Sequence, residues 1–274
     1  MVLGGTNSYT GGTAIEGGTP DHRGRPQSGA ASGNLVLDGG TLRTTADIAT
    51  ARTLAMSSSG GLLTDAGTTL TLNGAVSGAG SFDKAGSGTL IIAGAASHTG
   101  GTTINAGTVQ VGNGGTTGSL AGNVANAGVL AFDRSDDSIF AGATSGVGSL
   151  VQRGLGTTVL TGANTVTGGS IINSGALQIG NGGTSGSLAG NVSNAGILAF
   201  GRSDAMSFNG VISGIGQIRQ LGTGMTTLTA NSSSFVGQTR ISAGILSVNG
   251  QLGGTLTASG GTPDGKRHGR HDNQ

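Results

Sequence analysis

A long internal repeat is the feature of this sequence that most limits how the chain can fold. The segment GNGGTTGSLAGNVANAGVLAFDRSD at residues 112–136 recurs as GNGGTSGSLAGNVSNAGILAFGRSD at residues 180–204, and 21 of the 25 positions are identical. The same offset relates the run Gly88-Thr89-Leu90-Ile91-Ile92 to Gly156-Thr157-Thr158-Val159-Leu160. Self-similarity at a fixed period predicts stacked structural units in place of one globular core.

Further copies extend the repeat along most of the chain. SIINSG from Ser170 recurs as TRISAG from Thr239, a step one position longer because one residue is inserted near Ser232-Ser233-Ser234. An earlier, partial copy begins at Leu3 and aligns with the segment from Ile92. The insertion falls in a serine run, which indicates a change of loop length between otherwise similar units.

Within each copy the apolar residues alternate with small or polar ones. Leu177 and Ile179 flank Gln178, and Leu198 and Phe200 flank Ala199. This period of two predicts short strands, and the Gly-Asn, Asn-Gly and Gly-Gly steps between them predict turns. Strands this short need partners from neighbouring turns. The sequence therefore predicts an all-β parallel β-helix, or β-solenoid, with about three rungs per 68-residue repeat.

Equivalent positions of the repeat indicate which residues form the core. We expect Ile92, Leu160 and Leu228 to point inward and to form a column along the axis. The corner asparagines are open to two interpretations, stacked polar ladders or ordinary turn residues. The pairs concerned are Asn105 with Asn173 and Asn123 with Asn191.

Composition excludes several classes of function. The chain has 59 glycines and seven aromatic residues, six Phe and one Tyr, which disfavours a compact globular core. Hydrophobic residues make up 34% of the chain and the net charge is +1. This combination also disfavours disorder. The repeats carry no lysine and arginine cluster of the kind that nucleic acids require. Without cysteine there is no disulfide, thiolate metal site or thiol nucleophile.

The repeat resembles a known family at two quoted segments. GSGTLIIAGAASHTGGTTINAGTVQVGNGG from Gly86 and GLGTTVLTGANTVTGGSIINSGALQIGNGG from Gly154 are similar to the autotransporter-associated β-strand repeat of Gram-negative passenger domains. His98 and Val166 stand where the partial first copy has the aromatic Tyr9. The last copy matches the repeat less closely at Ser234-Phe235-Val236. The resemblance implies a right-handed parallel β-helix that reaches the cell surface through a C-terminal outer-membrane barrel.

The function that this resemblance implies is a stalk for surface display. Such a stalk aids export, offers an adhesive surface to host or cell-surface ligands, and performs no catalysis. We expect no cofactor and no nucleic-acid partner, and open solenoid ends that favour end-to-end self-association. The start lacks the charged-then-apolar pattern of a signal peptide and the end lacks barrel strands, so we expect a fragment or a degenerate reading frame whose export signal lies elsewhere.

Domain boundaries follow from the extent of the repeats. We expect a parallel β-helix repeat domain over residues 1–260, with a polar loop near 17–33. Residues 261–274 are expected to form a basic, disordered tail.

Each chemical motif has a simpler interpretation, so no catalytic, cofactor-binding or metal-binding residue is assigned. The phosphate-loop-like string from Gly260 to Lys266 lacks the Ser or Thr that should follow, since Arg267 stands there. Asp133, Asp136 and Asp137 beside Arg134 suggest an exposed turn with a local ion pair, because the second copy keeps only Arg202 and Asp204. The histidines and aspartate that metal binding would use lie in segments without predicted rigidity: His22, His268, His271 and Asp272.

Two other functions remain as alternatives. The first is a carbohydrate-acting β-helix enzyme, a lyase or hydrolase, but the carboxylates are scattered and Lys84 is the one lysine within the repeats. The second is an ice-binding solenoid with Thr-x-Thr arrays such as Thr69 with Thr71 and Thr255 with Thr257.

Overall fold

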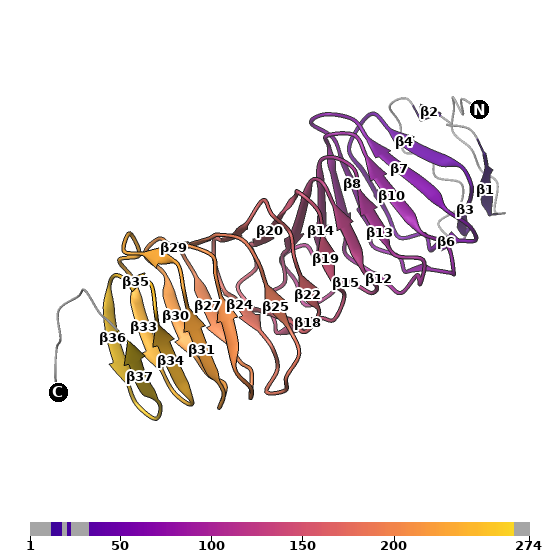
Figure 1. Cartoon of the computed structure of the whole chain (residues 1–274). Helices are drawn as coiled ribbons and strands as arrows, with labels where there is room; N and C mark the ends of the chain where they lie inside the picture. The colour runs from indigo at the N-terminus through magenta and orange to yellow at the C-terminus, as the bar shows by residue number, and fades with distance from the viewer. Residues whose placement is uncertain (1–11, 18–20, 23–32, 266–274) are drawn as a thin grey trace. The chain divides into compact units, whose positions relative to one another are not determined.

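The described residues form a parallel β-solenoid, which confirms the predicted fold class. In this computed structural model they are residues 12–17, 21–22 and 33–265. They contain strands and turns and no helix, and the strands pair in parallel with strands of neighbouring turns. The chain divides into two compact units, Met1–Arg134 and Ser135–Gln274. Figure 1 shows successive turns of paired strands within each unit.

The first unit contains three stacks of parallel strands. The β3 stack is β1 (Thr13–Glu16), β3 (Leu35–Asp38), β6 (Leu54–Met56), β9 (Val76–Ser77), β12 (Ala95–Ala96) and β15 (Ser119–Leu120). The β4 stack is β2 (Asp21–His22), β4 (Thr41–Thr44), β7 (Gly60–Thr64), β10 (Phe82–Ala85), β13 (Thr102–Ile104) and β16 (Val124–Asn126). The β11 stack is β5 (Ile48–Thr50), β8 (Thr69–Leu72), β11 (Thr89–Ile92), β14 (Thr108–Val111) and β17 (Val129–Phe132).

The second unit is built in the same way. The β21 stack is β18 (Ser138–Phe140), β21 (Thr157–Leu160), β24 (Ala176–Ile179), β27 (Ile197–Phe200), β30 (Gln217–Gln220), β33 (Gln238–Ile241) and β36 (Thr255–Ala258). The β31 stack is β28 (Met206–Phe208), β31 (Met225–Leu228), β34 (Ile245–Val248) and β37 (Thr262–Gly265). Shorter stacks are β19 (Thr144–Ser145), β22 (Ala163–Asn164) and β25 (Ser187–Leu188); β20 (Ser149–Gln152), β23 (Ser170–Ile172), β26 (Val192–Asn194) and β29 (Ile212–Ser213); and β32 (Asn231–Ser232) with β35 (Gln251–Leu252).

The alternating sequence places aliphatic side chains inside the coil. In β8 the outward residues are Thr69 and Thr71, and the inward residues Leu70 and Leu72 are buried. Leu70 pairs with Leu90 of the next turn. Burying each such side chain is worth roughly 1.5 to 3 kcal/mol, which supports strands too short to be stable alone.

Each turn contains three strands, whereas each repeat contains ten. β11 pairs with β8 and β14, three strands before and after it. Its equivalent one repeat later is β21, and the next is β31. The prediction of about three rungs per repeat is confirmed: a repeat contains three turns of three strands and one further strand. Ten strands are not a whole number of three-strand turns, so equivalent residues do not return to the same stack.

The predicted column of equivalent core residues is therefore wrong, although their burial is confirmed. Ile92, Leu160 and Leu228 are all buried. Within the second unit, Leu160 lies in the β21 stack and Leu228 lies in the β31 stack. The core columns are built from non-equivalent residues one turn apart.

The polar ladders that were one interpretation of the corner asparagines do not form, for the same reason. Adjacent turns pair residues about twenty positions apart, as Thr102 pairs with Val124, whereas each expected asparagine pair is 68 positions apart. Asn191 Oδ1 instead accepts a hydrogen bond from the Val211 amide at 2.9 Å. Buried asparagines at other positions bind turn backbone: Asn126 Oδ1 accepts from Gly128 N at 3.0 Å.

Paired backbone extends beyond the expected repeat boundary at residue 260. β37 pairs with β34, from Ile245 with Thr262 to Val248 with Gly265. Within the expected polar loop near 17–33, β2 pairs with β4, and most of that loop and residues 266–274 lie outside the described residues. None of the described residues belongs to a helix long and apolar enough to cross a membrane.

Candidate functional site

Two exposed loops recur with the same anchoring in consecutive repeats. The first GNGG loop, residues 112–118, joins β14 to β15, and its residues 113–117 are exposed. Arg134 Nη1 donates to Gly118 O at 2.7 Å, and Gly114 N donates to Asp133 O at 2.8 Å. The loop backbone is thus tied to the following turn at two points.

The second GNGG loop, residues 180–186, joins β24 to β25 and has equivalent contacts. Arg202 Nη1 donates to Gly186 O at 2.7 Å, and Gly182 N donates to Gly201 O at 2.6 Å. Arg202 also binds Asp204 through two hydrogen bonds, Nε to Oδ1 at 2.8 Å and Nη2 to Oδ2 at 2.6 Å. This hydrogen-bonded pair raises the pKa of Arg202 and lowers that of Asp204. The local ion pair expected at this turn is confirmed.

Two of the aspartates near Arg134, Asp133 and Asp137, bind other residues. Asp133 Oδ2 accepts from Gln110 Nε2 at 3.1 Å, and Asp137 Oδ1 accepts from Thr157 N at 3.0 Å. Among the described residues, no three histidine, aspartate or glutamate side chains are grouped so that they could hold a metal ion.

Lys84 is buried inside the first unit. It is 0% exposed, and its Nζ donates to the carbonyl oxygens of Ala85 at 2.8 Å, Gly86 at 2.7 Å and Ala106 at 3.2 Å. Burial lowers the pKa of this amine to about 8. The ammonium group occupies its three donors on turn carbonyls, so it is not available to a polysaccharide at the surface.

The later repeats place glutamine where the first has Lys84. Gln152 Nε2 donates to Gly154 O at 2.9 Å and Gly156 O at 3.2 Å. Gln220 Nε2 donates to Gly222 O at 3.0 Å and to Gly224 O at 3.2 Å. A long side chain that caps turn carbonyls from inside is the shared role, and sequence analysis missed it.

His98 occupies the position of the repeat's aromatic residue. It is buried, its ring centroid lies 4.8 Å from that of Phe82, and its Nε2 lies 3.1 Å from Thr102 Oγ1. Burial lowers its pKa. The equivalents Val166 and Phe235 are also fully buried, so the last copy keeps an aromatic side chain despite its inserted residue.

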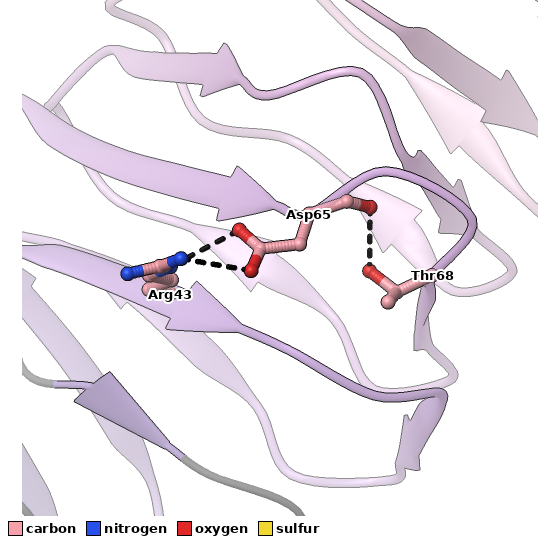
Figure 2. Close-up of polar contacts among 3 residues, drawn as sticks. All are labelled: Arg43, Asp65 and Thr68. Carbon is pink, nitrogen blue, oxygen red and sulfur yellow. Dashed lines mark hydrogen bonds and ion pairs between the residues drawn. The ribbon is translucent and has the colours of Figure 1, made fainter.

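A surface ion pair fixes one corner of the first unit, as Figure 2 shows. Arg43 of β4 donates to Asp65 through Nε at 3.0 Å and Nη2 at 2.9 Å, and Thr68 Oγ1 donates to Asp65 O at 2.8 Å. The hydrogen bond from Arg43 lowers the pKa of Asp65. This network closes the turn after β7.

Two arginines lie side by side on the outer face of the β21 stack. Arg219 of β30 pairs in register with Arg240 of β33. The outward residues of β30, β33 and β36 are named here the basic face: Gln217, Arg219, Gln238, Arg240, Thr255 and Thr257. No carboxylate belongs to it.

The remaining sequence candidates do not assemble into a site in the described part of the chain. Thr262–Gly265 of the phosphate-loop-like string form strand β37, so these residues lie in paired backbone and not in a loop. Thr71 pairs with Ile91, which ends the Thr-x-Thr array after one strand. The side chains of His22, His268, His271 and Asp272 lie outside the described residues.

Comparison with known proteins confirms the resemblance to autotransporter passengers. Residues 1–19, 82–111, 150–179 and 218–248 match the passenger-associated-transport-repeat family. The chain is 47% identical over 152 residues to the Adhesin BmaC autotransporter of Brucella suis biovar 1 (strain 1330). That match covers 56% of this chain and 4% of the relative, so the chain corresponds to a small part of that protein's length. No solved structure matches the chain.

Proposed function

We propose that this chain, which carries passenger-associated transport repeats, is a segment of the β-solenoid passenger of a surface adhesin. The observation that carries the proposal is the ten-strand repeat, which continues the same paired backbone through consecutive copies and matches the passenger repeat in four segments. Its role is to extend and display a binding surface outside the cell, after export through an outer-membrane barrel of the full-length protein.

Folding physics supports a role in export as well as display. Each turn pairs with the turn before it, so a solenoid can fold progressively as the chain emerges, and folded turns resist backward movement. Two of the described charged residues have structural roles: Lys84 binds turn carbonyls, and Arg202 holds the second GNGG loop. We propose that the segment has no enzymatic activity, since these groups are committed to structure.

Surface display can be tested with the whole chain placed between a signal peptide and an autotransporter barrel. We expect the chain to reach the surface of intact cells, where added protease cleaves it and an antibody binds it. A variant with buried Ile104 and Ile172 changed to Asp should fail to fold and should not be displayed. Retention of the unmodified chain inside the cell would contradict the proposal.

The carbohydrate-acting alternative has its own measurement. We expect the purified chain to release no reducing sugar or unsaturated uronide from pectin-like polymers. Sustained turnover by the unmodified chain, absent from the unfolded double variant, would show that the chain is an enzyme and would contradict the stalk function.

A further inference from the structure

The basic face has an arrangement that the fold itself does not require. Arg219 and Arg240 are directly opposed on adjacent parallel strands. Such strands lie about 4.8 Å apart. Like charges in this position repel each other and destabilise a sheet. One repeat earlier the equivalent residues are Val151 and Ile171, which form strands of the same kind without any charge.

The neighbouring side chains leave the two cations available. Arg219 Nε and Nη2 donate to Gln217 Oε1 at 3.1 and 2.9 Å, which orients the guanidinium group along its own strand. Arg240 is exposed and has no hydrogen bond or ion pair with any described residue. The nearest acidic groups in sequence are engaged elsewhere, since Asp204 binds Arg202 and Asp264 lies 3.4 Å from Ser247 Oγ.

We infer that the basic face binds a sulfated linear polysaccharide. Guanidinium groups bind sulfate and carboxylate oxygens through paired hydrogen bonds, and an anion between Arg219 and Arg240 would relieve their repulsion. The remaining residues of the face offer amide and hydroxyl groups for sugar hydroxyls: Gln238, Thr255 and Thr257 are exposed beside them.

The same observations disfavour a nucleic acid as the ligand. Single-stranded nucleic acids bind to positive grooves whose aromatic side chains stack on the bases. All the phenylalanines in the described part of the chain are buried. Duplex binding typically uses six to ten phosphate contacts, and this face has two cations.

The inference rests on the proposed function, because sulfated polysaccharides occur outside the cell. Binding to the purified chain tests the inference without depending on surface display. The probe is a heparin-derived octasaccharide, titrated by calorimetry against the full chain at low and physiological salt. We expect the double variant Arg219→Val and Arg240→Ile to bind about tenfold or more weakly. Its fold should be unchanged, since Val and Ile stand at the equivalent positions 151 and 171 of the preceding repeat. Circular dichroism checks this.

A charge-matched control separates this face from the rest of the chain. Lys266→Gln with Arg267→Gln removes two positive charges from the C-terminal segment, and this variant should keep the affinity of the unmodified chain. The inference would be overturned if the Lys266/Arg267 variant lost octasaccharide binding while the Arg219/Arg240 variant kept it. Equal binding of single-stranded DNA, or of desulfated heparin, would also overturn it. Failure of surface display with octasaccharide binding intact would instead count against the proposed function alone.

Discussion

Leu160 and Leu228, which face the interior of the second unit, lie in different stacks of strands. Leu160 pairs with Phe140 and Ile179, whereas Leu228 pairs with Phe208 and Val248. They occupy the same position of consecutive repeats, and ten strands separate β21 from β31. Since a turn holds three strands, one repeat shifts the chain by three turns and one strand. Each equivalent residue therefore meets new neighbours, which lets the core vary while the strand pattern is kept.

This arrangement predicts which core residues are energetically coupled. Leu160 and Ile179 are fully buried and directly paired. Leu160→Ala and Ile179→Ala should each cost about 2 to 5 kcal/mol, because each leaves a cavity in the core. In a double-mutant cycle measured by urea unfolding, residues in contact show a coupling of roughly 0.5 to 3 kcal/mol, and we expect this pair to fall in that range.

The matched control is the equivalent pair, Leu160→Ala with Leu228→Ala, whose residues lie in separate stacks. Residues that share no partner have effects that add within roughly 0.3 to 0.5 kcal/mol, and we expect this pair to do so. Coupling between Leu160 and Leu228 as strong as that between Leu160 and Ile179 would contradict the three-strand turn.

The sequence predicted the local structure better than the stacking. Alternation in segments such as Leu177-Gln178-Ile179 predicted the strands, since the inward side chains must be apolar. The stacking partner of each residue could not be read from the 68-residue repeat, because identity between copies marks the repeat and not the physical neighbour. Pairs one turn apart, such as Phe140 with Leu160, can have little in common beyond being apolar.

The internal cap was missed because lysine and glutamine are usually exposed. A signal was present: Lys84, Gln152 and Gln220 stand at the same position of the repeat, and each begins a turn rich in glycine. A long donor at that place satisfies carbonyl groups that would otherwise be buried without partners.

Lys84→Gln is predicted to stabilise the first unit. The variant keeps an amide donor of the kind that Gln152 uses and removes the cost of burying a charge, so at pH 7 the free energy of unfolding should rise by about 1 to 3 kcal/mol. Chemical denaturation followed by circular dichroism measures this. Gln152→Lys is the reciprocal variant and should destabilise the second unit; a lower stability for Lys84→Gln would show that the ammonium group is favourable where it lies.

The gain from Lys84→Gln should depend on pH. The pKa of Lys84 is about 8 in the folded chain against 10.5 for exposed lysine, so the unfolded chain holds the proton more strongly. The free energy of unfolding of the unmodified chain therefore rises as pH increases through that window, whereas the glutamine variant lacks this contribution. The difference between them should shrink from pH 7 to pH 10, and a constant difference would contradict burial of the charge as its cause.

His98 should make the first unit sensitive to acid. Its pKa in the folded chain is below 6.5, so the unfolded chain binds more protons. Stability therefore falls as pH decreases below about 6.5. Changing His98 to Phe, the residue at the equivalent position 235, should reduce the loss of stability between pH 7.5 and pH 5. Thermal unfolding at both values gives the measurement, and an equal loss in the two proteins would exclude His98 as the source.

Two glycines of the first GNGG loop should respond differently to alanine. Gly118 has a φ of +98°, and an added Cβ would lie 2.5 Å from Gly112 N and 2.6 Å from Ile92 O. Gly118→Ala should therefore cost about 2 kcal/mol or more. Gly115 has no atom within 4 Å of an added Cβ. Gly115→Ala should therefore change stability by less than about 0.5 kcal/mol. Similar losses in both variants would show that the loop tolerates no side chain at all.

The order of the second GNGG loop should depend on Arg202 more than on its ion pair. Arg202 Nη1 holds Gly186 O, while Nε and Nη2 bind Asp204, so the two contacts use different donors. Arg202→Gln should raise amide hydrogen exchange and protease cleavage across residues 181–185 by about tenfold, because the arginine tie to Gly186 O is lost. Asp204→Asn retains the donor to Gly186 O and should have a much smaller effect on that loop. If the two variants loosened it equally, the ion pair would be what positions the guanidinium group, and the carbonyl contact would be a consequence of that position.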